Sequence, residues 1–233
     1  MTGTLINAAA ILVGGAAGLL ARKGIPERYQ KIILSGLGLF TLGIGIDLFM
    51  DGEQSLVILA SVLVGSLLGE WWQIEARLAH LGERIEKLYN RANGKAGDDT
   101  FVRGFVSASL LFCIGPMAIL GSIQDGLSGD YKLLLIKSVM DGFATLALST
   151  SLGVGVIFSV LSVLVYQGAI SLLAAQMQTI LTAAMINELN AVGGILLLGL
   201  AISTLLEIRQ IKVGNMMPAL ILAPVFVAIA AMF

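Results

Sequence analysis

Long apolar runs dominate this 233-residue sequence and limit what it can fold into. Each run is close to the roughly 17 to 25 residues that an α-helix needs to cross the hydrocarbon core of a bilayer. The runs do not alternate apolar and polar residues, as the strands of a membrane barrel do. Backbone groups in lipid must be hydrogen-bonded within the chain, so we predict that each run is a helix. The runs cover residues 3–21, 31–50, 55–72, 101–121, 132–150, 153–174, 190–206 and 216–233.

Composition agrees with a membrane protein. The chain is 57% hydrophobic and only 12% charged, whereas soluble domains carry roughly 25% charged residues. No basic residue precedes the first run, and Arg22 and Lys23 follow it, which is the reverse of a secretory signal. We therefore predict an all-α polytopic transmembrane helix bundle of about eight spans, with residues 1–233 as one domain.

The charges between the runs predict the topology. With eight spans, every basic connection falls on one side and every acidic connection on the other. The positive-inside rule then places the basic side in the cytoplasm and both termini outside. Removing any single internal run would put basic connections on both sides. The basic connections are residues 22–31, 77–103 and 209–212, and the acidic ones contain Asp51 and Glu53, Asp125 and Asp130, and Glu188.

The longest connection, residues 73–100, is predicted to contain a cytoplasmic amphipathic helix that ends at Asn93–Gly94. Its apolar residues recur at spacings of four and three, which makes one narrow stripe. The stripe either rests on the bundle or on lipid headgroups, or forms a coiled coil between protomers of a homo-oligomer. It is shorter than the three to four heptads typical of a coiled coil, which favours the first interpretation. The stripe consists of Ile74, Leu78, Leu81, Ile85 and Leu88.

Small residues and prolines indicate how the helices pack and bend. Two GxxxG pairs allow close approach of helix backbones, and in a multi-span chain they favour packing within the protomer. Prolines inside a span remove a backbone donor and bend the helix. The GxxxG pairs are Gly14 with Gly18 and Gly65 with Gly69, and the predicted bends are at Gly115–Pro116, Pro218 and Pro224.

The sequence lacks the residues that several classes of function require. A net charge of −1 argues against a nucleic-acid partner. Cys113 and His80 are the only residues of their types, so neither a cysteine metal cluster nor a His-based zinc site or catalytic triad can form within one chain. The sequence contains no HExxH and no Walker motif. We therefore expect no enzyme and no cofactor.

Charged residues within a span are the strongest candidates for function, because each costs about 2.5–3.5 kcal/mol near the bilayer centre. Asp141 lies near the middle of the fifth run, with Lys137 one turn before it. The two either form an ion pair that only fixes packing, or leave Asp141 facing a cavity as a cation contact. Thr145 and Ser149 continue the same helix face and indicate a hydrophilic track.

Other polar residues gather in the outer half of the predicted bundle. Asp47 and Gln167 lie in the second and sixth runs, and Asn7 and Asn190 open the first and seventh. A water-filled outer vestibule would explain them together. The alternative is that they cap helices or bond between helices. The similar segments Ile6–Asn7–Ala8 and Leu189–Asn190–Ala191 indicate either a parallel internal repeat or a chance match between two glycine-rich helices.

Several short segments resemble one bacterial family. They are Gly3-Thr4-Leu5-Ile6-Asn7 with Gly14-Gly15, Ile25-Pro26-Glu27-Arg28, Gly36-Leu37-Gly38-Leu39 and Gly43-Ile44-Gly45. The chain is similar along nearly its whole length to the membrane proteins numbered 554 among the domains of unknown function. The resemblance implies a prokaryotic inner-membrane protein without an established activity, and it supplies no functional residues.

A second resemblance is local. Met140-Asp141-Gly142-Phe143-Ala144 is similar to the membrane Asp motif of small manganese exporters of the lysine-exporter superfamily. That motif usually has Ala where this chain has Gly142. The resemblance implies that Asp141 contacts a cation, metal ions included.

These observations lead to two hypotheses. The first is a multi-pass bacterial inner-membrane transporter or exporter of a cation or cationic solute. Its binding candidates are Asp141, Lys137, Gln167, Asp47, Thr145, Asn7 and Asn190. The second is a membrane scaffold or accessory subunit, in which the buried polar groups only specify packing. In both, the lipid bilayer is the main partner.

Overall fold

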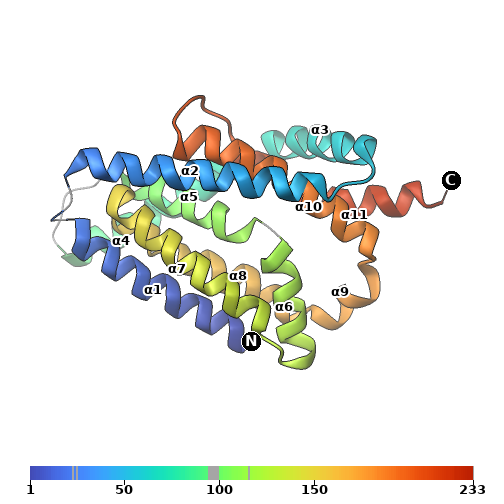
Figure 1. Cartoon of the computed structure of the whole chain (residues 1–233), viewed down its shortest axis with the longest axis horizontal. Coiled ribbons are helices and arrows are strands. Elements are labelled where there is room, and N and C mark those ends of the chain that lie inside the picture. Colours follow the sequence, from blue (N-terminus) through green and yellow to red (C-terminus); the bar gives the residue numbers. More distant parts are fainter. Residues whose placement is uncertain (23, 25, 94–99, 115, 233) are drawn as a thin grey trace.

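The computed structural model describes residues 1–233 except 23, 25, 94–99, 115 and 233. Helices make up nearly all of this described part, which contains no strand (Figure 1). The α-helices are α1 (Thr2–Arg22), α2 (Glu27–Met50), α3 (Ser55–Trp72), α4 (Ile74–Asn93), α5 (Thr100–Cys113), α6 (Pro116–Ser128), α7 (Lys132–Leu152), α8 (Ser159–Leu172), α9 (Ala174–Ile180), α10 (Ala183–Leu200) and α11 (Pro218–Ala230). Short turns extend three of them: 3-10 turns at Val154–Val156 and Val213–Met216, and a π-helical turn at Ala201–Leu205.

The predicted spans are present. Seven helices of the described chain, with the short turns that extend them, are long and apolar enough to cross a membrane. The fourth predicted span consists of two helices, α5 and α6, whose axes differ by 63°. If this bent pair is one span, the number is eight, as predicted. The bend predicted at Gly115–Pro116 involves residue 115, which lies outside the described residues.

Among the boundaries that differ from the prediction, two have a clear physical reason. Helix α10 begins at Ala183, seven residues before the predicted apolar run, and the Thr182 side chain caps it by accepting a hydrogen bond from the Met185 amide at 3.3 Å. The first turns of α10 contain Glu188 and Asn190, which are buried against polar partners, so an apolar run does not reveal them. Pro218 is the first residue of α11 instead of a bend within it, where its missing amide hydrogen costs little.

The connections gather at two opposite ends of the bundle (Figure 1). Helices α1 and α7 run side by side in the same direction, since Gly3 faces Leu134 and Gly18 faces Leu146. We call the end with Arg22, Arg103 and Lys212 the basic end. The opposite end, with Asp51, Asp125 and Glu188, is the acidic end. This separation agrees with the predicted alternation of loops, while the orientation of the termini across the membrane stays a prediction.

Helix α4 lies against the basic end of the bundle. Gln73 ends α3 in the left-handed conformation, with φ 51°, so the chain turns sharply before α4 begins. Gly82 of α4 is buried against Phe105, and the Tyr89 ring contacts the rings of Phe101 and Phe158. The predicted apolar stripe is therefore divided. Leu78 packs against the core, whereas Leu81 and Leu88 point outward and are exposed.

The GxxxG pairs are used within the chain. A Cβ atom on Gly14 would lie 2.2 Å from the carbonyl oxygen of Gly142, so the backbones of α1 and α7 are in direct contact. Gly65 and Gly69 of α3 contact α11 and the 3-10 turn before it in the same way. Close backbone contact of this kind is the packing that small residues allow in membranes.

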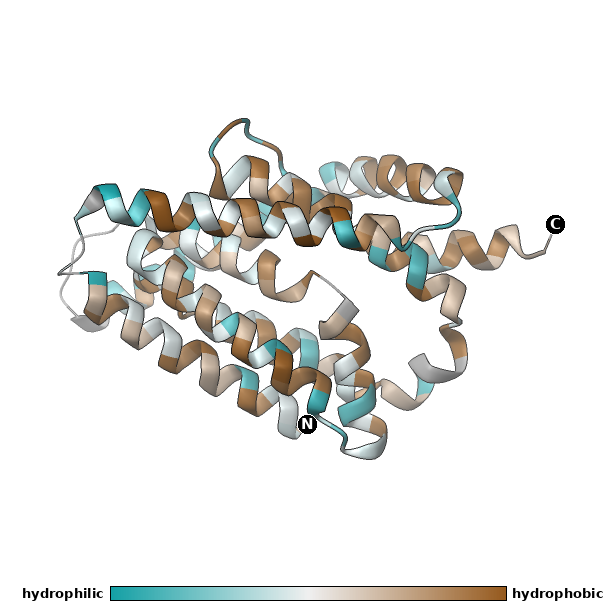
Figure 2. Cartoon of the chain, in the orientation of Figure 1, coloured by the Kyte–Doolittle hydropathy of each residue, from teal (hydrophilic) through white to brown (hydrophobic). Residues whose placement is uncertain are grey.

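The burial of the side chains distinguishes the core of the bundle from its lipid-facing surface. Helix α10 is the most buried span, and the large side chains Phe105 and Phe112 of α5 are fully buried within the bundle. Helices α1, α2 and α3 expose many large apolar side chains, among them Leu20, Leu56 and Leu67. Figure 2 shows hydrophobic residues along the helices and hydrophilic residues mainly toward the connections. A surface of this kind is suited to lipid.

Candidate functional site

A buried ion pair lies within α7. The Lys137 ammonium donates to Asp141 Oδ2 from one turn earlier on the same helix, and the two side chains are only 7% and 10% exposed. Asn7 of α1 also donates to Asp141 Oδ2, from Nδ2 at 2.9 Å. Both groups are neutralised by their pairing, and this lowers the cost of placing charge inside a membrane. The pair therefore belongs to the fold as well as to any binding site.

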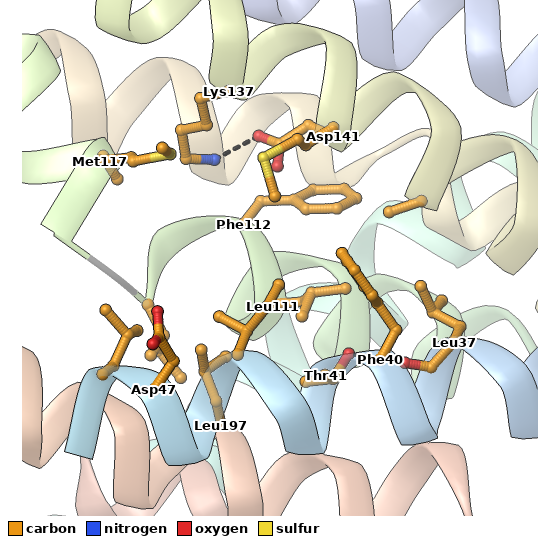
Figure 3. Close-up of a pocket in the computed structure, with 16 residues that line it drawn as sticks. Leu37, Phe40, Thr41, Asp47, Leu111, Phe112, Met117, Lys137, Asp141 and Leu197 are labelled. Atoms are coloured by element: carbon orange, nitrogen blue, oxygen red, sulfur yellow. Dashed lines mark hydrogen bonds and ion pairs between the residues drawn. The ribbon is translucent and has the colours of Figure 1, made fainter. Parts of the chain in front are cut away.

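The ion pair borders a cavity of about 340 Å³ between α2 and α7. Figure 3 shows Lys137 and Asp141 on one wall, with Asp47 of α2 across the cavity from them. Asp47 is exposed and lies toward the acidic end of α2. Three charged side chains from two helices thus line one cavity. The lining also includes Leu37, Phe40, Thr41, Ile44, Leu48, Leu111, Phe112, Ile114, Met117, Ala118, Met140, Ala144 and Leu197.

The charges in this cavity do not balance. Asp47 and Asp141 carry two negative charges when ionised, against one positive charge on Lys137. The remaining walls are almost entirely apolar and include the rings of Phe40 and Phe112. The Lys137 nitrogen lies 5.9 Å from the centre of the Phe112 ring, within the range of a cation–π contact. The cavity is therefore electrostatically suited to one further positive charge.

Helix breaks lie next to the cavity. Ile114 precedes the bend between α5 and α6, and Met117 and Ala118 follow it, and all three line the cavity. Leu197 of α10 lines it one turn before the π-helical turn Ala201–Leu205. Interrupted helices in membrane proteins are tolerated where they are enclosed in protein or line a cavity. Single π-turns in helices are also frequent at functional sites.

Thr145 and Ser149 do not extend the polar wall of the cavity. The Thr145 hydroxyl is fully buried and donates to the backbone carbonyl of Asp141 at 2.6 Å, not to its carboxylate. Hydroxyls in membrane helices commonly bond back to their own helix in this way. Ser149 is buried and contacts α1 at Gly18. The polar track expected from the sequence is thus replaced by helix packing.

Gln167 is buried apart from the cavity. It lies on α8, fully enclosed, and neither side-chain amide atom has a hydrogen-bond partner in the described residues. It does not line the cavity with Asp141 and Asp47. Asn7 is also absent from the cavity lining: its Nδ2 bonds to Asp141, while its Oδ1 has no partner among the described residues.

Asn190 belongs to a separate polar cluster at the acidic end. Its Nδ2 donates to Asp51 Oδ2 at 2.9 Å. Nearby, Glu188 Oε1 accepts from the backbone amides of Glu53 and Gln54, at 2.9 and 2.8 Å. These bonds attach the start of α10 to the connection between α2 and α3. The residues expected to form one outer vestibule are therefore divided. One lines the cavity, one bonds to Asp141, one is buried on α8, and one lies at the connection between α2 and α3.

Sequence reasoning missed the aromatic walls and one buried acid. Phe40 and Phe112 face the cavity, but apolar runs without a polar face give no signal of which side chains point inward. Asp125, placed in a loop by the sequence, is buried at the end of α6 and accepts from the Gly3 amide at 3.0 Å. A carboxylate at a helix start is a favourable partner for the free amides there.

The fold and the cavity define a multi-pass helical membrane protein with a charged internal site. The chain belongs to the family described as "Protein of unknown function (DUF554)", which matches residues 2–228. It is 31% identical to the "Uncharacterized membrane protein YdfK" of Bacillus subtilis, over 100% of this chain and 98% of the relative. It is 32% identical to the "Uncharacterized protein YqgA" of Escherichia coli, over 95% and 94%.

No solved structure matches the chain. The family membership predicted from the glycine-rich segments is confirmed. The local resemblance of residues 140–144 to manganese exporters stays a prediction.

Proposed function

We propose that this chain is a transporter of small organic cations in the bacterial inner membrane, with Asp141 and Asp47 as the carboxylates that attract the substrate. The observation that carries the proposal is the arrangement of Asp47 opposite the Lys137–Asp141 pair across one cavity. The helical spans and the bacterial relatives support the choice of membrane, because outer-membrane proteins are typically closed barrels.

The composition of the walls favours an organic cation over a bare metal ion. Hard metal ions need about six oxygen ligands, and the cavity offers two carboxylates and the hydroxyl of Thr41, which already donates to Leu37 of its own helix. Among the described residues, no group of three or more His, Cys, Asp or Glu side chains comes together. Aromatic rings and aliphatic walls instead suit an alkylammonium, which is bound through one charge and its apolar surface.

Lys137 has a specific part in this proposal. Its ammonium already occupies the Asp141 carboxylate, so it acts as a resident cation when no substrate is present. A substrate cation first meets the exposed Asp47 and then competes with Lys137 for Asp141. With the substrate bound, two positive charges face the two carboxylates Asp141 and Asp47 in one cavity, so neither a buried carboxylate nor the Lys137 ammonium lacks a counter-charge. The bent pair α5 and α6 borders the cavity, as discontinuous helices do at the substrate sites of many transporters.

The first test is binding to the purified full chain. Choline should raise the unfolding temperature, while its neutral carbon isostere, 3,3-dimethyl-1-butanol, should not, because only the cation pairs with a carboxylate. Asp47→Asn should weaken choline binding by at least about tenfold, equivalent to about 1.4 kcal/mol. Asp130→Asn, which removes an exposed acid outside the cavity, is the matched control.

The second test is uptake of labelled choline into proteoliposomes. Asp47→Asn should lower uptake while leaving the unfolding temperature of the empty protein unchanged, since Asp47 is exposed. If none of choline, tetramethylammonium and tetraethylammonium binds or is transported, the proposal fails, and binding of sodium or potassium alone would also contradict it.

A scaffold function is the second candidate, and one observation favours it. Lys137, Asp141 and Asn7 bond to one another and fasten α1 to α7 without any ligand. In that case the polar groups only specify which helices pack together. The absence of any cation binding, together with a role of the pair in stability, would favour this candidate.

A further inference from the structure

The outward face of α4 carries a one-sided distribution of charge. Viewed along the helix, residues spaced by three and four positions form a single exposed stripe. Its charged members are all basic, and two large apolar side chains lie among them, with Leu81 48% and Leu88 69% exposed. The stripe consists of Arg77, His80, Leu81, Arg84, Lys87, Leu88 and Arg91.

The acidic residues of α4 lie elsewhere on the helix. Glu75 is turned toward the bundle, where its Oε2 accepts from the Gly214 amide at 2.8 Å. Glu86 lies on the opposite side from the stripe, one turn before Asn90, which donates to it at 3.4 Å. Glu83 is only partly exposed at the flank. The acids of α4 thus do not neutralise the stripe, and within the described part of the chain none of its Arg or Lys side chains forms an ion pair, so it presents a positive surface.

The inner face of α4 is already occupied. Gly82 is buried against Phe105, Tyr89 packs on Phe101 and Phe158, and Leu78 joins the core. The helix is therefore held in a fixed rotation, with the basic stripe facing away from the protein. A hollow on this outer side is lined by Arg77, His80, Leu81 and Arg84.

Two tryptophans lie beside the start of the stripe. Trp71 and Trp72 end α3, with 77% and 46% of their surface exposed, and Gln73 then turns the chain into α4. Exposed tryptophan at the end of a span is typical of the interface between hydrocarbon and headgroups. The first turn of α4 therefore begins at the depth of the lipid headgroups.

We propose that this stripe of α4 binds the anionic phosphate headgroups of the surrounding bilayer. Guanidinium groups bind phosphate oxygens through paired hydrogen bonds, and the hollow between Arg77 and Arg84 offers two of them. Leu81 and Leu88 enter the boundary with the acyl chains, as the apolar residues of an interfacial helix do. The proposal is independent of what the cavity between α2 and α7 carries.

The charge pattern argues against a second copy of the chain as the occupant. A symmetric contact places the same patch of both copies face to face. Arg77, Arg84 and Arg91 would then meet the same cations of the partner, which is repulsive. The coiled coil considered from the apolar stripe is disfavoured for the same reason.

The chain contains its own reporter for a test, because Trp71 and Trp72 are its only two tryptophans. The full chain is placed in phosphatidylcholine nanodiscs that contain equal small fractions of spin-labelled phosphatidylglycerol or spin-labelled phosphatidylcholine. Quenching of tryptophan emission then measures how much of each lipid lies beside α4. We expect labelled phosphatidylglycerol to be enriched at least about fivefold, the preference that a single basic residue near the surface gives.

The triple variant Arg77→Gln, Arg84→Gln and Arg91→Gln should remove this preference without loss of folding, since all three side chains are exposed. The matched control, Arg28→Gln, Lys132→Gln and Arg209→Gln, removes the same charge from other exposed positions and should keep the preference. Equal quenching by the two labelled lipids in the unaltered chain would overturn the proposal, as would an equal loss in both triple variants. A further test adds soluble glycerol phosphate at the same concentration as the labelled lipid. If it abolishes the preference for labelled phosphatidylglycerol, the ligand is free phosphate and the proposal is overturned.

Discussion

Asn7 of α1 donates its side-chain amide to Asp141 Oδ2 of α7 at 2.9 Å, beside the Lys137 ammonium that donates to the same oxygen. This bond joins two helices whose backbones already touch at Gly14 and Gly142. The close contact brings the short Asn7 side chain within reach of the carboxylate. The position of the ion pair at the cavity wall therefore depends on helix packing as well as on its own charges.

The bond itself should contribute modestly to stability. Asn7→Ala should lower the free energy of unfolding by about 0.6 kcal/mol, the average for hydrogen bonds between membrane helices, and by no more than about 1.7 kcal/mol, the largest value measured. Reversible unfolding in mixed micelles measures the change. Asn187→Ala, at a half-buried position in α10, is the control and should have a smaller effect. An equal effect of both substitutions would contradict a specific role for the bond to Asp141.

The contact between α1 and α7 should be intolerant of a single added methyl group. A Cβ on Gly14 would lie 2.2 Å from the Gly142 carbonyl oxygen and 3.2 Å from its Cα, and neither backbone atom can move aside cheaply. Gly14→Ala should therefore destabilise the protein by about 1–3 kcal/mol, as overpacking does. Gly43→Ala is the control, because a Cβ there meets nothing within 4 Å. Equal unfolding temperatures for the two variants would contradict this packing.

Much of the fold could be predicted because lipid leaves the backbone few choices. A run such as residues 55–72 must be a helix to satisfy its own hydrogen bonds, and α3 has these bounds. The start of α10 could not be predicted in this way, because Glu188 and Asn190 are polar yet buried. Their partners, such as Asp51, lie more than a hundred residues away in the chain, and hydropathy within a run does not reveal such a pairing.

The candidate site could be predicted only in part, for a related reason. Asp141 and Lys137 are conspicuous because charge inside a span needs a cause. Asp47 faces these two residues, whereas Gln167 points elsewhere. This difference is set by the rotation of α2 and α8 about their own axes. Almost uniformly apolar helices carry little periodic signal for that rotation. The same lack of a periodic signal explains why the sequence does not reveal that Phe40 and Phe112 line the cavity.

Glu75 should make stability depend on pH at the basic end. Its partial burial raises the pKa of the carboxyl above the ordinary value of 4.5, against the opposing hydrogen bond from the Gly214 amide. The folded state then holds the proton more tightly than the unfolded state, so this group's contribution to stability falls as pH rises from about 4.5 through the raised pKa. Glu75→Gln cannot ionise and should show a shallower fall in unfolding temperature over this range. A fall as steep as that of the unaltered chain would contradict this account.

The two ends of the bundle should face opposite sides of the membrane. We expect the acidic end outside and the basic end in the cytoplasm. In intact cells, an impermeant maleimide should label cysteines introduced at Glu53 and Asp130, and label those at Arg91 and Arg209 only after permeabilisation. All four positions are exposed, and the native Cys113 is buried, so the unaltered chain is the blank. Labelling of Arg91→Cys or Arg209→Cys in sealed cells would refute this orientation.

The Lys137–Asp141 pair should behave as a coupled unit in stability. Among the described residues, Lys137→Met leaves Asp141 with only the Asn7 amide as a side-chain partner, and Asp141→Asn leaves Lys137 as a buried cation without a counter-charge. Removing one member of a buried pair costs about 3–5 kcal/mol, whereas replacing both is often nearly neutral. We therefore expect either single variant to unfold more easily, and the double variant Lys137→Met with Asp141→Asn to recover most of the loss.

The double variant also separates the two candidate functions. It should fold and insert as the unaltered chain does, yet fail to bind or transport choline, because it lacks the buried carboxylate that the substrate needs. Full recovery of stability with unchanged choline binding would place the substrate site elsewhere. If single and double variants are equally destabilised, the two residues do not act as a pair, and the resident-cation role of Lys137 is wrong. Unfolding in mixed micelles, measured with and without choline for all four proteins of the cycle, distinguishes these outcomes.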